Sequence, residues 1–221
     1  MAIAENGPGG HHRGRLGNVV YYVLNGKNVT RKIGVPTKPF TEDQLKQNLV
    51  TKIRSQFIRD LLGFINTGFS IEAEQALSNG FNQAVKSNLR IIVGAYPNLE
   101  IAYDRVFLSK GPLKPVQNWT VTETGNGLQY NWDTDPKMPW PDATDQVMLL
   151  AYFPKQKKVF YTLFGNTRLS GNDFLEIPPS LQGKHMETYM SIISADRKQL
   201  SDSIYTGSFN SQKTENKLLK G

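Results

Sequence analysis

The sequence predicts an α+β fold in which an N-terminal β-hairpin and an αα-hairpin are followed by an all-β sandwich. Three observations predict it. An Asn-Gly dipeptide separates two strand-like segments near the N-terminus. Apolar residues recur at every fourth position in the next segment, and from residue 99 onward the pattern changes to alternation. We therefore divide the 221 residues into a flexible Gly-rich arm (1–17), a β-hairpin plus two-helix domain (18–100), a connecting strand and linker (101–114), the sandwich (115–207) and a flexible tail (208–221).

The hairpin is the clearest local signal. Residues 19–24 and 27–33 read as strands joined by Asn25-Gly26 in a type I′ turn. Pairing Leu24 with Lys27 places Val20, Tyr22, Leu24 and Val29 on one face and Val19, Tyr21 and Val23 on the other. An isolated hairpin that is apolar on both faces must be covered, either within its own chain or by a neighbouring subunit. The candidate assembly interface is therefore Val19, Val20, Tyr21, Tyr22, Val23, Leu24 and Val29.

Two helices are predicted next. Thr41 and Gln44 have the spacing of a capping box, which opens the first helix, and Gly68 is its expected end. The second helix is expected to begin near Ser70 and to end before Gly94 and Pro97. We expect the apolar stripes to form a core and not a cofactor pocket, because helical spacing needs only packing to explain it. The stripe of the first helix is Leu45, Leu49, Ile53, Phe57, Leu61 and Ile65.

Short alternating segments with regular turns follow, as in an all-β sandwich. After a connecting strand over 99–108, the expected strands are 119–123, 128–132, 146–153, 158–164, 173–177, 186–195 and 199–205.

The stretch from Trp119 to Trp132, with Pro136 shortly after it, resembles the first two strands of a fibronectin type III domain. The segments 175–181, 189–196 and 201–203 are similar to its last strands, in which Tyr189 would be the buried tyrosine. This resemblance covers residues 115–207 and implies an immunoglobulin-like sandwich. The corner between Leu181 and Tyr189 is longer than that family prefers, so a variant Greek-key sandwich is the alternative.

A second resemblance covers almost the whole chain. Its motifs are Asn6-Gly7-Pro8, the stretch from Gly14 to Lys27, Tyr96-Pro97-Asn98 and Leu108-Ser109-Lys110-Gly111. They resemble an uncharacterised protein family of Bacteroidota. That resemblance implies a lineage and no activity.

The whole net charge of +7 lies in residues 1–59, which hold ten Lys or Arg against three acids. Such a segment can contact nucleic acid, an anionic membrane surface or an acidic partner, or can simply be a solvated face. The candidate phosphate contacts, with Tyr21 or Tyr22 stacking on bases, are Arg13, Arg15, Lys27, Arg31 and Lys32.

No catalytic motif is found. The chain has no Cys, and its histidines are His11, His12 and His185, too few in one place for a metal site. Four acids in a Pro-rich loop lack the order of a calcium-binding loop and are expected to be solvated: Asp133, Asp135, Asp142 and Asp145. We expect no enzyme activity, no cofactor, no metal and no small-molecule substrate.

These patterns predict a non-enzymatic, self-assembling structural protein whose arm and hairpin pair with a neighbouring subunit in a filament, fibre or virion-like assembly. The alternative is a nucleic-acid-binding module that uses the basic segment. No apolar run has the length of a signal-peptide core or a membrane span. We therefore expect a homo-oligomer or polymer that is cytoplasmic or part of an assembled particle or fibre.

Overall fold

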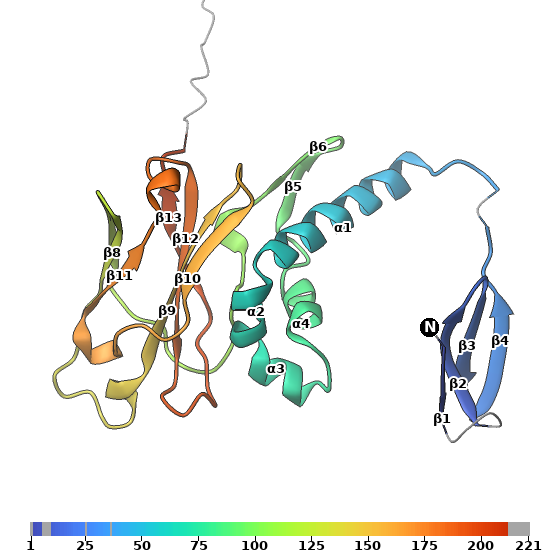
Figure 1. Ribbon diagram of the computed structural model, residues 1–221, viewed down its shortest axis with the longest axis horizontal. Helices are drawn as coiled ribbons and strands as arrows, with labels where there is room; N and C mark the ends of the chain where they lie inside the picture. The colour runs from blue at the N-terminus through green and yellow to red at the C-terminus, as the bar shows by residue number, and fades with distance from the viewer. Residues whose placement is uncertain (1, 6–9, 25, 36, 212–221) are drawn as a thin grey trace, which may run out of the picture. The chain divides into compact units, whose positions relative to one another are not determined.

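A computed structural model describes residues 2–5, 10–24, 26–35 and 37–211. The chain forms two compact units, residues 1–45 and 46–221, which are described one at a time. Most of its strands belong to antiparallel sheets, accompanied by a few helices (Figure 1). The first unit contains β1 (Ala2–Glu5), β2 (His11–Leu16), β3 (Val19–Leu24) and β4 (Lys27–Lys32), and α1 (Glu42–Asp60) begins in it.

The first unit is a four-stranded sheet in the order β1-β2-β3-β4. We expected a flexible arm over residues 1–17, but its described part contains two of these strands. The reason is a tight turn: Leu16 lies opposite Val19, and Gly17 between them has a φ of +59°, which glycine adopts without strain. Leu24 lies opposite Lys27, the register that the sequence predicted. Gly26 has a φ of +75°, whereas the other predicted turn residue, Asn25, is outside the described residues.

In the second unit, residues 46–211 form three antiparallel sheets. One has the strand order β10-β9-β12-β13, another has the order β11-β8-β7, and the third is the pair β5-β6. The strands are β5 (Ile92–Ala95), β6 (Asn98–Ile101), β7 (Thr120–Thr124), β8 (Gly127–Asn131), β9 (Gln146–Phe153), β10 (Lys158–Thr162), β11 (Asn172–Glu176), β12 (Met186–Ile193) and β13 (Ile204–Phe209).

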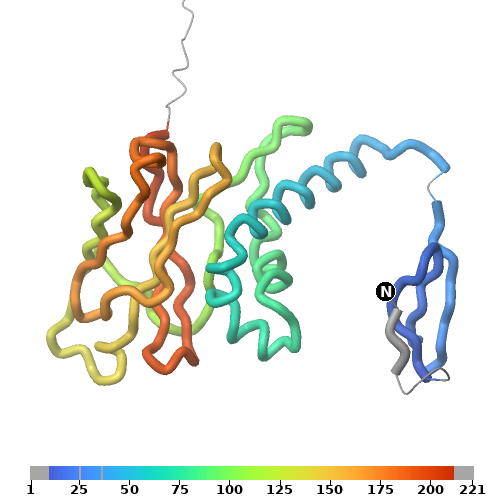
Figure 2. The backbone as a smooth tube through the Cα atoms, viewed as in Figure 1, coloured from blue at the N-terminus to red at the C-terminus, as the bar shows by residue number. Residues whose placement is uncertain are grey.

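The sheet β10-β9-β12-β13 is covered on both faces. Alternate residues of β9 belong to different cores: Leu149 packs with residues of β8 and β11, whereas Leu150 packs with residues of the helices. On the helical side this core includes Phe57 and Phe64. The second unit is therefore layered as sheet, sheet and helices, an order that can be followed in Figures 1 and 2.

Four helices form where two were predicted: α1, α2 (Leu62–Gly68), α3 (Ser70–Gln75) and α4 (Gly80–Ser87). The capping box of α1 is confirmed, since Thr41 N–H donates to Gln44 Oε1 and Gln44 N–H donates to Thr41 Oγ1. The predicted second helix is interrupted because Asn79 caps a new helix with its side chain, 2.8 Å from Asn82 N.

The expected connecting strand over 99–108 is also different. Only its first part is a strand: β6 pairs with β5 in a short hairpin, and a 3₁₀ turn over Tyr103–Arg105 follows. Leu108 is fully buried, and its N–H donates to Ser203 Oγ. The expected linker at 101–114 is thus bound to the rest of the second unit and separates no domains.

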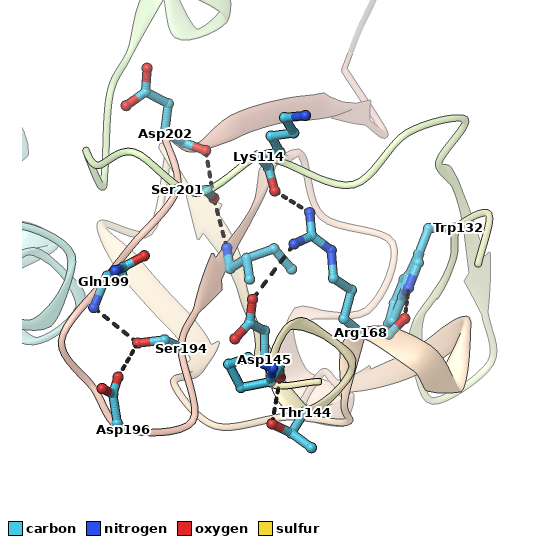
Figure 3. Close-up of polar contacts among 12 residues, drawn as sticks. Lys114, Trp132, Thr144, Asp145, Arg168, Ser194, Asp196, Gln199, Ser201 and Asp202 are labelled. Atoms are coloured by element: carbon cyan, nitrogen blue, oxygen red, sulfur yellow. Dashed lines mark hydrogen bonds and ion pairs between the residues drawn. The ribbon is translucent and has the colours of Figure 1, made fainter. Parts of the chain in front are cut away.

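The last strand also differs from the prediction of 199–205. β13 begins at Ile204, while Leu200 and Ser201 form only isolated bridges. Ser201 instead uses its hydroxyl locally, accepting from Ile192 N–H and donating to Asp202 O (Figure 3). Of the expected tail, residues 208–211 are described and residues 212–221 are not.

Candidate assembly interface

The register of the N-terminal sheet determines which side chains share a face, because residues directly opposite each other in neighbouring strands point the same way. Tyr21 lies opposite Gly14 and Thr30, whereas its neighbour Val20 lies opposite Arg15 and Arg31. We name the two sides by their content. The face that carries Leu16, Val19, Tyr21 and Val23, together with His12, Asn28, Thr30 and Lys32, is called the apolar face; the basic face is Arg13, Arg15, Val20, Tyr22, Leu24, Lys27, Val29 and Arg31.

This arrangement separates the predicted basic residues. Arg13, Arg15, Lys27 and Arg31 share one face, whereas Lys32 lies opposite Val19 and joins the apolar face. The predicted apolar interface residues are divided between the two faces in the way that their alternation predicted. The sequence did not place Arg13 and Arg15 beside them, because the strand β2 was not predicted.

No residue of the sheet whose exposure the structure describes is buried. Among the residues of the first unit whose exposure the structure describes, 10–24, 26–35 and 37–45, every one is half-buried or exposed. Leu16 is 62% exposed and Leu24 54% exposed. A sheet normally buries one face against another element, and the described residues of this unit provide no second layer. Both faces are therefore available for contact with something outside this unit.

Polar contacts on the sheet are local. Arg15 Nε donates to Gly17 O at 2.8 Å, which ties this guanidinium to the turn before β3. His11 Nδ1 is 2.7 Å from Asn28 Oδ1, and the ring of His12 lies 5.9 Å from that of Tyr21. His185 is elsewhere, in contact with Glu187. The described residues contain no group of three or more side chains that could hold a metal ion.

Sequence reasoning missed a buried ion pair in the second unit. Arg168 Nη1 is 3.6 Å from Asp145 Oδ2, and Arg168 also donates to Lys114 O and accepts from Trp132 Nε1 through its carbonyl (Figure 3). Asp145 was expected to be solvated, but only 4% of its side chain is exposed. Burial raises the pKa of the Asp145 carboxyl, and the charge of Arg168 opposes that rise. Arg168 thus connects three segments: the chain at Lys114, the residue before β9 (Asp145) and the residue after β8 (Trp132).

A second buried acid, Glu187 in β12, was also missed. Its carboxylate accepts from Tyr205 Oη at 2.6 Å and Ser208 Oγ at 3.2 Å, and it contacts His185 Nε2 at 2.8 Å. These partners come from β13 and from the residue before β12, so the carboxylate joins neighbouring segments of one sheet. We infer a structural role, because each carboxylate oxygen already has a partner within the protein.

The structure defines the class of protein: a β-rich mixed α/β protein whose N-terminal sheet has no buried residue among those of described exposure. None of the helices in the described part of the chain has the length and apolar character of a membrane span. Comparison with known proteins adds the family. The chain belongs to a family of unknown function, DUF6266, whose sequence profile matches residues 11–207. The match covers the strands β2, β3 and β4 as well as nearly all of the second unit. No curated protein and no solved structure matches the chain.

Proposed function

We propose that this protein is a non-enzymatic structural protein that self-assembles, and that the apolar face of its N-terminal sheet packs on a neighbouring subunit. The single observation that carries the proposal is a four-stranded sheet without a buried residue among those whose exposure is described. Val19, Tyr21 and Val23 are half-buried, and each Å² of apolar surface that stays exposed to water forgoes about 25 cal/mol of hydrophobic stabilisation. A second subunit that covers this face would recover that free energy.

Face packing suits this sheet better than pairing along the β4 edge. That edge carries Lys27, Arg31 and Lys32, and charged side chains on an edge strand oppose the addition of another strand. The apolar face has one of these cations, Lys32, at its margin. A contact that closes on itself gives a ring or shell, and one that does not gives a filament or fibre.

In the same proposal, the second unit is the body of the subunit and is a fibronectin type III-like sandwich. Its first, second and fifth strands, β7, β8 and β11, share one sheet, and the remaining four share the other. One core lies between these sheets and includes Tyr130 and Trp132. The sequence resemblance to Bacteroidota proteins supports a Bacteroidota lineage as part of this proposal.

Matched triple substitutions in β3 test the proposal. Val19→Thr, Tyr21→Thr and Val23→Thr change the apolar face, whereas Val20→Thr, Tyr22→Thr and Leu24→Thr change the basic face of the same strand. Threonine keeps a branched side chain that suits a strand. We expect the wild type to form oligomers that resist high salt and only the apolar-face variant to lose them, as measured by light scattering after size exclusion. A monomeric wild type, or equal losses in both variants, would refute the proposal.

A second function is favoured by one specific observation. The basic face interleaves Tyr22 with Arg13, Arg15 and Arg31, and aromatic side chains among cations bind single-stranded nucleic acid by stacking and phosphate contacts. The alternative is therefore a nucleic-acid-binding module that uses this face. It does not compete with assembly for the same side chains.

Binding of a mixed-sequence single-stranded oligonucleotide tests this alternative. The double variant Arg13→Gln/Arg31→Gln should weaken binding and reduce the slope of log K against log salt by about 0.7 for each phosphate that is no longer neutralised. Lys32→Gln is the matched control, because this residue is on the other face. Equal effects of the double variant and the control would exclude a defined nucleic-acid face.

A further inference from the structure

A hollow of about 390 Å³ in the second unit is lined by the end of α4, by the residues just after it, and by Arg105 and Phe107. Three cations line it, Lys86, Arg90 and Arg105. The apolar side chains of Leu89 and Phe107, which also line it, are 57% and 38% exposed. Within the described part of the chain, no acidic side chain lines this hollow. It therefore combines positive charge with apolar surface, and we call it the basic hollow.

The charges of the basic hollow are largely uncompensated. Lys86 and Arg90 are exposed, and among the described residues their side chains form no ion pair and no hydrogen bond. Arg105 has only a long contact, 3.9 Å from its Nε to Asp104 Oδ2, and both side chains are largely exposed. Because such an exposed pair contributes little, Arg105 can exchange it for another anion at small cost. Three cations beside one acid thus favour an anionic group in the hollow.

Hydrogen bonds hold the two walls of the basic hollow together. Asn88 is 1% exposed; its Nδ2 donates to Phe107 O at 2.7 Å, and its Oδ1 accepts from Phe107 N–H at 2.8 Å. Arg54 donates through Nη1 to Leu89 O at 3.3 Å. The backbone that carries Leu89 and Phe107 is therefore fixed before a ligand arrives, which lowers the cost of ordering on binding.

We propose that the basic hollow binds a small organic anion in which a carboxylate or phosphate is joined to an apolar group. Charge complementarity supports this ligand, because the guanidinium groups of Arg90 and Arg105 can each pair with such an anion through two N–H donors. Leu89 and Phe107 then cover the apolar group. Small-molecule pockets have volumes of about 300–1,000 Å³, and the hollow lies within this range. This inference goes beyond the proposed assembly and does not depend on it.

Naphthyl phosphate is the probe, because it joins an aromatic group to a phosphate, whereas naphthol and inorganic phosphate each lack one of the two. In calorimetric titrations of the intact chain, we expect it to bind at least about tenfold more tightly than either. Lys86→Gln/Arg90→Gln should weaken its binding by about tenfold or more. The control Lys158→Gln/Lys184→Gln removes the same charge at exposed positions that do not line the hollow, and should leave binding unchanged.

Leu89→Ser tests the apolar wall. It should weaken binding of naphthyl phosphate and leave binding of inorganic phosphate unchanged, whereas Leu77→Ser, at a position 97% exposed and outside the hollow, should change neither. Urea unfolding checks that all four variants are folded.

Three results would overturn the proposal. The first is inorganic phosphate binding as tightly as naphthyl phosphate, and the second is equal effects of the two double variants or of the two serine variants. The third is co-sedimentation with phosphatidylglycerol vesicles that Lys86→Gln/Arg90→Gln abolishes, in a protein that does not bind naphthyl phosphate in solution. That result would assign the hollow to a lipid surface.

Discussion

At the scale of single residues, Arg168 has the most consequential contacts in the second unit. Its guanidinium reaches both Asp145 and the backbone of Lys114, and its carbonyl accepts from Trp132. Replacing Arg168 by Met would leave the Asp145 carboxylate buried without a counter-charge. We expect a loss of about 3–5 kcal/mol in the free energy of unfolding, measured with urea.

The exposed pair formed by Arg105 and Asp104 supplies the control. The two side chains are 63% and 66% exposed, and their charged atoms are 3.9 Å apart. Arg105→Met should change the free energy of unfolding by less than about 1 kcal/mol. Similar losses for Arg168→Met and Arg105→Met would show that the buried pair contributes no more than a surface pair.

A glycine at the end of α2 makes a close approach possible. A Cβ atom added to Gly68 would overlap Leu108 O, and Lys110 N–H donates to Gly68 O at 3.1 Å. Gly68→Ala should therefore lower the free energy of unfolding by about 1–3 kcal/mol, because the neighbouring backbone must move. Gly125→Ala, where an added Cβ meets nothing within 4 Å, should be neutral or slightly stabilising in the same urea titration. Equal stability of the two variants would contradict the close approach.

The residue scale also shows where sequence reasoning succeeds. The capping box of Thr41 and Gln44 could be predicted because its partners are three residues apart and the motif is local. Arg168 and Asp145 are 23 positions apart, and neither carries a local sign of its partner. Gly68 was expected to end a helix, which it does, but its contact with Leu108 depends on the tertiary fold.

At the scale of elements, α4 depends on its first turn. Asn79 accepts from Asn82 N–H at 2.8 Å and thereby satisfies a helix donor that has no partner in the helix. Asn79→Ala should cost about 1 kcal/mol of stability, whereas Asn79→Asp, which keeps the acceptor oxygen, should cost much less. Thermal unfolding followed by circular dichroism measures both. If the aspartate variant is as unstable as the alanine variant, capping is not what Asn79 contributes.

Element prediction from periodicity worked where an element carries its own pattern. The strands β8, β9 and β12 agree closely with the expected ranges, and the first helix begins where expected but ends at Asp60, before the expected end at Gly68. β2 was missed because its residues, His-His-Arg-Gly-Arg-Leu, show no apolar alternation, and it is a strand because it pairs with β1 and β3. The apolar residues of β3, which are half of the candidate interface, were thus predictable from the sequence. The basic face was not, because Arg13 and Arg15 can be placed on it only from the register of β2.

At the scale of the whole molecule, buried and half-buried tyrosines make stability fall at alkaline pH. Burial, reinforced by the charge of Glu187, raises the pKa of Tyr103 to about 12. Burial likewise raises the pKa of Tyr130, Tyr152, Tyr189 and Tyr205. A raised folded-state pKa means that the unfolded chain releases its protons first, so stability is intact below about pH 10 and falls as the pH rises.

We therefore expect the midpoint of urea unfolding to fall steadily above about pH 10. Tyr103→Phe removes one of these ionisations and should make the fall less steep. Absorbance of tyrosinate, recorded in the same titration, would show whether ionisation and unfolding coincide. A midpoint that stays constant up to about pH 12 would contradict the role assigned to these buried rings.

We expect the two units to differ in their resistance to local unfolding. The second unit has buried cores on either side of β9 and β12, while residues 10–24, 26–35 and 37–45 of the first unit include none that is buried. Hydrogen exchange should therefore be slowest in β9 and β12 and fastest in β2 and β3 at low protein concentration. If the apolar face is an assembly contact, protection of β3 should increase with protein concentration. Protection of β3 equal to that of β9 in a dilute monomer would contradict a sheet without a core.

Because both faces of β9 and β12 are buried, the contrast between a buried and a solvent-exposed face cannot specify their register. Where one face of a strand is wet, a slip of one position exposes apolar groups and is penalised. Here Val147 and Met148 face different cores and both are apolar, so a slip would exchange one apolar row for another. Buried polar groups distinguish the correct register from a shifted one: Thr188 Oγ1 donates to Gly207 O, and Glu187 accepts from Tyr205. A mispaired β12 would leave these groups without partners, so a few hydrogen bonds select the correct alignment in an otherwise uniform interior.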